Sequence, residues 1–215
     1  MRSSVSSFLT VLVFAFSAFA ASAKVERIDR PASLAIPETI WKVLDPRGYR
    51  ITLEDGSELC DLWLRKNIPA STRKGSDARL YPQLSPSTMV GMISFPKAAA
   101  DYKGDPVPAG LYTMRYELLP ADGNHLGVAP NPDFVLLVPA GSDPDPAAQF
   151  SAEELVNLSR KTTRSQHPAP LSLVQPGDSE IVKDDQDHWI FSGKVGMVDG
   201  SQLRLGLVVK GTALQ

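Results

Sequence analysis

The sequence predicts an all-β fold, namely an antiparallel β-sandwich of the jelly-roll or immunoglobulin-like type with one short α-helix. The chain spreads 18 prolines and 15 glycines over 215 residues, and short apolar runs lie between these turn-forming residues. Several runs alternate apolar and polar residues, which places one side of a strand in a core and the other side in solvent. Many short strands separated by turns are typical of sandwiches and barrels.

The first 23 residues are predicted to be a cleavable secretory signal. Arg2 is their one charged residue, an apolar run extends from Phe8 to Ala20, and Ala21-Ser22-Ala23 has the small-x-small pattern of a cleavage site. The apolar run is shorter than the roughly 20 residues of a membrane-spanning helix. We therefore expect a mature protein without a membrane span, exported to the periplasm or the medium. A retained membrane anchor is the alternative.

The mature chain, residues 24–215, has the length of a single domain. The formal net charge of the whole sequence is −2, and this balance argues against an electrostatic grip on nucleic acid or anionic lipid. A single cysteine cannot form an internal disulfide. In "ELCDLWL" the alternation puts Cys60, Leu62 and Leu64 on one strand face. Cys60 is therefore predicted to be a buried core residue rather than a nucleophile.

The first part of the domain predicts a lead-in, a hairpin and a strand. Residues 24–45 contain two prolines and are expected to form an extended lead-in. Tyr49–Leu53 and Leu59–Leu64 are β-prone runs on either side of Asp-Gly at positions 55 and 56, a strong hairpin signal because glycine accepts the positive φ of the turn. After a long connection, "MVGMISF" at Met89–Phe95 predicts the next strand.

Two strands are predicted at the centre of the chain. In "GLYTMRYEL" one face carries Tyr112, Met114, Tyr116 and Leu118, whereas Thr113, Arg115 and Glu117 fall on the other. This pattern predicts a half-buried strand with its polar face in solvent. "FVLLV", at Phe134–Val138, is apolar on both faces and predicts a strand covered from both sides.

The last third predicts a helix, a hairpin and a closing strand. Ser151 and Glu154 have the spacing of a capping box, and Phe150 and Leu155 have that of a hydrophobic staple, so a helix of about three turns is expected to begin there. "EIVKDDQDHWIFSGKVG" predicts a hairpin with a hydrated acidic tip at Asp184–His188, and "QLRLGLVVKG" predicts the last strand.

"PVPAGLYTMRYEL" followed by "FVLLVPA" resembles the Pro-Ala-Gly-x-Tyr hairpin of uncharacterised exported bacterial β-sandwich domains, which are grouped as domains of unknown function. The resemblance covers roughly residues 85 to 140. It implies a sandwich fold and export, and it implies no particular activity or site residue.

A ligand site is predicted in the polar loops at the strand ends. Asp122, Asn124 and His125 lie within four residues, and Asp133 follows in "NPD". Carboxylate and amide oxygens near a glycine can bind Ca²⁺. The same residues are also ordinary turn residues, because Asx side chains bond to their own backbone. No cofactor is predicted, and both interpretations of the loop stay open.

The aromatic residues and histidines supply the remaining candidates. Trp63 has apolar neighbours on both sides and is predicted to lie in the core, whereas Trp189 is left open as a sugar-stacking platform. His167 and His188 stand apart from each other and from His125, unlike the close ligand spacing of common zinc sites.

The leading functional hypothesis is an exported, non-catalytic binding or envelope-associated module, with carbohydrate or an envelope protein as partner. No Gly-x-Ser-x-Gly, His-Glu-x-x-His or phosphate-binding glycine loop occurs in the sequence. The alternative is a secreted hydrolase or metal-dependent enzyme that uses loop histidines and aspartates. Convergence of two histidines and a carboxylate in space favours the enzyme, and scattered histidines favour the module.

Overall fold

A computed structural model describes residues 22–31, 36–71, 79–120, 131–163 and 165–213. The predicted signal segment, apart from its last two residues, and the loop at Asp122–His125 lie outside these ranges and stay predictions. Within them, no helix is both long enough and apolar enough to cross a bilayer.

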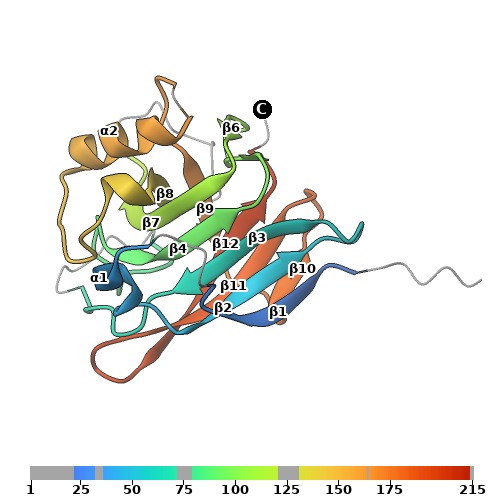
Figure 1. Cartoon of the computed structure of the whole chain (residues 1–215), viewed down its shortest axis with the longest axis horizontal. Coiled ribbons are helices and arrows are strands. Elements are labelled where there is room, and N and C mark those ends of the chain that lie inside the picture. Colours follow the sequence, from blue (N-terminus) through green and yellow to red (C-terminus); the bar gives the residue numbers. More distant parts are fainter. Residues whose placement is uncertain (1–21, 32–35, 72–78, 121–130, 164, 214–215) are drawn as a thin grey trace, which may run out of the picture.

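Ten strands form one antiparallel sheet in the order β1-β2-β3-β4-β7-β8-β9-β12-β11-β10 (Figure 1). Their bounds are β1 Lys24–Asp29, β2 Arg47–Thr52, β3 Glu58–Leu64, β4 Met89–Phe95, β7 Gly110–Leu118, β8 Asp133–Pro139, β9 Pro170–Val174, β10 Ile181–Lys183, β11 Trp189–Gly196 and β12 Gln202–Lys210. A separate pair, β5 Ala99–Ala100 and β6 Pro106–Val107, flanks a tight turn. The helical elements are α1 Glu38–Trp41, a 3₁₀ turn at Ala140–Ser142 and α2 Ala152–Thr163.

The sheet curls until its two halves meet, which gives a nearly closed, barrel-like shape. The sheet passes from one half to the other at β9, which pairs with β8 through residues 170–172 and with β12 through residues 173–174. On the other side, Ile68 bridges to Met197, and the rings of Tyr49 and Phe191 lie 4.9 Å apart. β1 and β10 are the two ends of this sheet. The predicted antiparallel all-β fold with one short helix is confirmed at this level.

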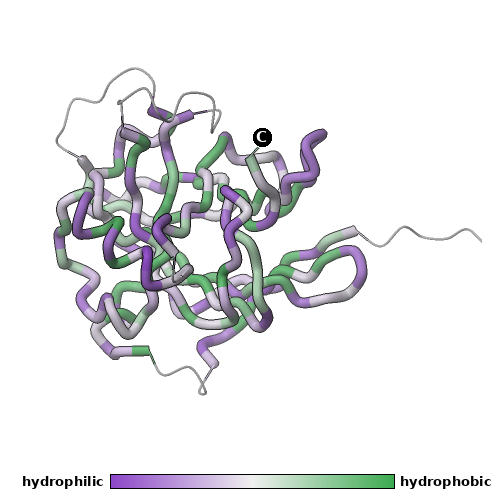
Figure 2. The backbone as a smooth tube through the Cα atoms, turned by 90° about the horizontal axis from the view of Figure 1, so that it is seen from above, coloured by the Kyte–Doolittle hydropathy of each residue, from purple (hydrophilic) through white to green (hydrophobic). Residues whose placement is uncertain are grey.

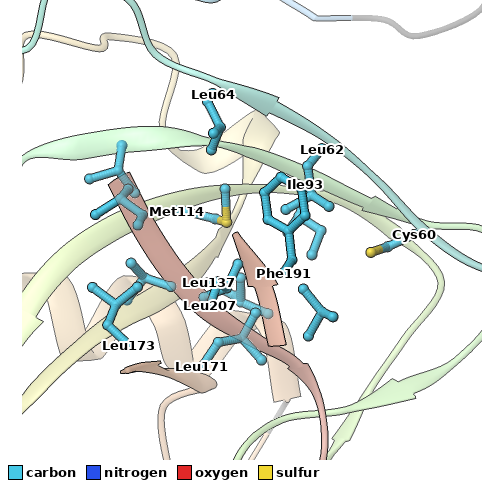
Figure 3. Close-up of a cluster of buried hydrophobic side chains, with 14 of the residues drawn as sticks. Cys60, Leu62, Leu64, Ile93, Met114, Leu137, Leu171, Leu173, Phe191 and Leu207 are labelled. Atoms are coloured by element: carbon cyan, nitrogen blue, oxygen red, sulfur yellow. The ribbon is translucent and has the colours of Figure 1, made fainter. Parts of the chain in front are cut away.

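The interior of the curled sheet is filled with apolar side chains from both halves (Figure 3). The void left among them is about 10 Å³, too small for an organic ligand. The halves pack tightly at Gly193, because a Cβ there would clash with the side chain of Leu64. Cys60 is buried in this core with a free thiol, as predicted, and burial raises the pKa of that thiol.

The locally encoded elements agree with their predictions. The Asp-Gly hairpin joins β2 to β3, with Gly56 at φ +79°. The capping box is present, since the backbone N–H of Ser151 donates to Oε2 of Glu154 at 2.8 Å and that of Glu154 donates to Oγ of Ser151 at 3.3 Å. Hydrophilic and hydrophobic residues interchange at short intervals along the chain (Figure 2). The lead-in differs in part, because it contains the edge strand β1 and the single turn α1.

The prediction that β7 exposes its polar face to solvent is wrong. Thr113 and Arg115 are 0 % exposed, because residues 140–150 cross over that face. Arg115 makes five hydrogen bonds there, to both carboxylate oxygens of Asp143 and to the carbonyls of Ser87, Asp145 and Ala148. The charged residue therefore belongs to a second buried layer rather than to the surface.

The same layer covers β8, and the prediction that this strand is enclosed on both sides is confirmed. Helix α2 packs against β8 through Leu155, which joins Leu136 and Val138 in one cluster. Ser159 and Thr162 on the buried side of the helix both donate to the carbonyl of Leu137, at 2.8 and 2.9 Å. Hydroxyls thus satisfy the polar backbone where helix and sheet meet.

Candidate functional site

Of the predicted loop ligands, Asp133 is the one that the structure describes. Its carboxylate is fully buried and accepts hydrogen bonds from the backbone N–H groups of Leu80 and Tyr81 and from the hydroxyl of Tyr116. Burial, followed by the nearby Asp133 carboxylate, raises the pKa of the Tyr116 phenol, which keeps its proton for this contact. These bonds fasten the connection before β4 to the start of β8. Asp122, Asn124 and His125 lie outside the described residues.

The two candidate tryptophans are both buried. Trp63 is fully enclosed and packs edge-on against Trp41 at 5.6 Å, so its prediction as a core residue is confirmed. Trp189 is 8 % exposed and belongs to the main core cluster, with the Lys183 ammonium 5.5 Å from its ring. A ring buried to this extent offers little area for sugar stacking.

The two described histidines do not converge. His167 is exposed on the return from α2. His188 is 4 % exposed, with Nδ1 3.0 Å from Oδ2 of Asp184 and Nε2 2.9 Å from the carbonyl of Thr212. The hydrated tip predicted at Asp184–His188 is therefore wrong for the histidine, which locks the hairpin to the C-terminal segment. Among the described residues, no group of three or more His, Cys, Asp or Glu side chains is placed to hold a metal.

A polar cleft of about 510 Å³ joins residues from both ends of the sheet order, and we call it the seam cleft. One side comes from the strand pair β1–β2. The other comes from β11, β12 and the connection that precedes β10. The lining residues are Arg27, Tyr49, Asp178, Ser179, Glu180, Ser192, Lys194 and Arg204. The cleft is large enough to take a small organic molecule.

Two cations lie side by side in the seam cleft. Lys194 on β11 and Arg204 on β12 are direct cross-strand partners, so their side chains leave the same face of the sheet. Both residues are exposed. Arg204 donates from Nη2 to the carbonyl of Gly177 at 2.6 Å, whereas the Lys194 ammonium has no hydrogen-bond or ion-pair partner among the described residues.

A third cation lines the cleft from the opposite end of the sheet. The Arg27 guanidinium stacks over the ring of its cross-strand neighbour Tyr49, 4.0 Å from the ring centroid. Nη2 also donates to the carbonyl of Arg47 at 3.1 Å. These contacts fix the guanidinium plane without neutralising its charge, since the Asp45 carboxylate is 4.0 Å away and half exposed.

Two carboxylates, Asp178 and Glu180, line the cleft on the connection from β9 to β10. The connection is fixed to β11, because the Gly177 N–H donates to Oγ of Ser192 at 2.8 Å and the Ser192 N–H donates to the carbonyl of Glu180 at 2.8 Å. Neither carboxylate makes an ion pair or side-chain hydrogen bond to any described residue. The cleft thus carries unpaired acceptors as well as unpaired donors.

Comparison of the chain with protein-family models, with curated proteins and with solved structures found no match.

Proposed function

We propose that this protein is an exported, non-catalytic binding module and that the seam cleft is its ligand site. The observation that carries the proposal is the set of five charged side chains in that cleft, on three strands and one connection. Four of them make no ion pair to any described residue, and Arg27 has only the Asp45 carboxylate at 4.0 Å. Elsewhere the interior is filled, and buried polar groups such as Asp133 and Arg115 are occupied by structural hydrogen bonds. Charged side chains that gather in a cleft are suited to orient a bound ligand.

Several predictions from the sequence belong to this proposal. Export rests on the apolar N-terminal run and its small-residue end. A bacterial β-sandwich family of unknown function, an envelope location and the jelly-roll or immunoglobulin-like subtype rest on the hairpin resemblance and on the strand pattern. The hydrolase alternative draws no support from the described histidines, since one is exposed and the other has both ring nitrogens engaged.

A ligand screen with a cleft-blocking variant tests the proposal. Thermal unfolding of the mature chain is followed with neutral sugars, anionic sugars, amino acids, polyamines and divalent ions. We expect at least one class to raise the melting temperature, because a ligand that binds the folded state stabilises it.

Ser179→Trp places a bulky side chain at the lining of the cleft without changing its charge, and this variant is expected to abolish the shift. Ser165→Trp, at an exposed serine outside the lining, is the matched control and is expected to keep it. A ligand whose shift survives Ser179→Trp would place binding elsewhere and contradict the proposal, as would a screen in which no class binds.

A further inference from the structure

We infer that the seam cleft binds an anionic, hydroxyl-bearing small molecule or chain end, of the sugar acid or sugar phosphate class, with its anionic group held between Lys194 and Arg204. The inference rests on the proposed function, because it names the ligand of the same cleft. It goes beyond that function by assigning the charge of the ligand, the two side chains that bind the anionic group and the two that bind the hydroxyls.

The Lys194–Arg204 pair departs from a rule that the rest of this sheet follows. Glu26 faces Arg50, Asp29 faces Arg47 and Arg50 faces Asp61, so these cross-strand charged pairs join opposite signs. The Arg50–Asp61 pair is bidentate, at 2.8 and 2.7 Å. Like charges directly opposite each other destabilise an antiparallel pair.

An anion between the two side chains removes this repulsion and gains charge-assisted hydrogen bonds. The Arg204 guanidinium already donates one hydrogen bond to the carbonyl of Gly177, which fixes the direction of the side chain. Lys194 is free to turn and adds a flexible point charge, while the fork of the arginine suits carboxylate or phosphate oxygens. Arg27 contributes a third positive charge on the other side of the cleft.

The two carboxylates define the rest of the ligand. Asp178 and Glu180 accept hydrogen bonds and repel anions, so they select a group that donates. Hydroxyls on the same molecule as the anionic group meet both requirements. A bare anion satisfies the cations alone, and a neutral sugar satisfies the carboxylates alone. A hydroxylated anion uses both sets at once.

Three hexose-sized probes separate these possibilities. Glucuronate carries a carboxylate, glucose 6-phosphate carries a phosphate, and glucose carries neither. Each is titrated at constant ionic strength, set with sodium chloride, while the backbone amide resonances of the mature chain are followed by NMR. We expect one or both anions to shift the amides of residues 192–194 and 204 and to bind at least tenfold more tightly than glucose, since a charge-assisted bond contributes more than that factor. The stronger of the two anions identifies the anionic group.

Charge-removing variants assign the binding to the pair. Lys194→Gln and Arg204→Gln are each expected to weaken anion binding about tenfold. Lys210→Gln is the matched control, because Lys210 is an exposed lysine on the same strand as Arg204 but outside the cleft lining, and it is expected to leave binding unchanged. Far-UV circular dichroism checks that all three variants fold.

The failure of this inference differs from the failure of the proposed function. Glucose binding as tightly as the anions, or anion binding that survives both Lys194→Gln and Arg204→Gln, overturns the anionic assignment while the cleft remains a binding site. Anion-induced shifts that map away from the cleft residues overturn both. Absence of binding by both anions overturns the inference alone if another class in the screen is blocked by Ser179→Trp.

Discussion

Charged side chains are paired within the buried layer over β7–β8, whereas Lys194 in the seam cleft has no described partner. Under residues 140–150, Arg115 is 0 % exposed and makes five hydrogen bonds, two of them to an equally buried Asp143. In the seam cleft, Lys194 is exposed and has no described partner, and its cross-strand neighbour is another cation. The buried layer neutralises its charge within the fold, whereas the seam cleft leaves charge available.

The difference follows from the cost of a charge in each environment. A buried ion without a partner costs several kcal/mol, so Arg115 is compatible with folding only together with Asp143 and the surrounding carbonyls. An exposed charge stays hydrated, so an unfavourable neighbour costs only a few tenths of a kcal/mol. Unpaired charges can therefore persist at the seam cleft, where we propose that they bind a ligand.

The largest effect is expected from removing the partner of the buried arginine. Asp143→Ala leaves the Arg115 guanidinium uncompensated in the buried layer, and we expect it to lower the free energy of unfolding by about 3–5 kcal/mol. Urea denaturation at neutral pH measures this change. Glu38→Ala is the control, since it removes one partner of the exposed Arg30–Glu38 pair at 3.2 Å and should cost less than about 1 kcal/mol. Equal losses of unfolding free energy in the two variants would show that the buried ion pair contributes no more to stability than an exposed one.

Asp101 is an intermediate case, buried but only partly compensated. Its Oδ1 accepts from the N–H groups of Lys103 and Asp105, while Oδ2 has no hydrogen-bond partner among the described residues. Burial raises the pKa of this carboxyl from 3.8 to about 6. Because the folded state then holds a proton that the unfolded state releases, this group makes the free energy of unfolding fall as pH rises from about 4 to about 7.

Asp101→Asn keeps the Oδ1 acceptor and cannot ionise, so it is expected to flatten that slope. Urea denaturation at several pH values between 4 and 7 measures it for both proteins. Asp55→Asn is the control, because hydrogen bonds from Ser57 lower the pKa of that exposed carboxyl, and the slope should persist in the variant. Identical slopes in the wild type and Asp101→Asn would show that Asp101 is not the source.

A smaller effect is expected at the start of the helix that covers β8. Ser151→Ala removes the hydroxyl that caps α2 and should lower the free energy of unfolding by about 1 kcal/mol. Ser151→Thr keeps a hydroxyl and should lose much less. A loss in Ser151→Ala as large as that in Asp143→Ala would mean that the buried layer depends on the helix end rather than on its ion pair.

Features encoded by neighbouring residues could be predicted from the sequence, and features that depend on distant pairing could not. The Asp-Gly turn, the capping box and the Met89–Phe95 strand each rest on short local patterns. Burial of Arg115 could not be predicted, because the segment that covers it lies about 30 residues further along the chain and carries no recognisable signal.

The same limit applies to the seam cleft and to His188. Lys194 and Arg204 are ordinary polar positions of two strands, and only the register of β11 on β12 places them opposite each other. The burial of His188 could not be predicted either, because it depends on the Gly211–Thr212 segment, which returns to pack against the ring. Gly211 has φ +134° there, and a Cβ at this position would clash with the His188 ring. The sequence marks Asp133 as a candidate ligand residue, and in the structure its carboxylate accepts the hydrogen bonds that fasten β8.

The most direct test of the contrast between the buried layer and the seam cleft is the free energy of unfolding of Lys194→Glu at low ionic strength. The substitution turns the like-charge pair with Arg204 into an opposite-charge pair on an exposed face, so we expect the free energy of unfolding to stay the same or rise by a few tenths of a kcal/mol. The same variant should lose anion binding. A fall in the free energy of unfolding of more than about 1 kcal/mol would contradict the account, because it would mean that Lys194 serves the fold as Arg115 does.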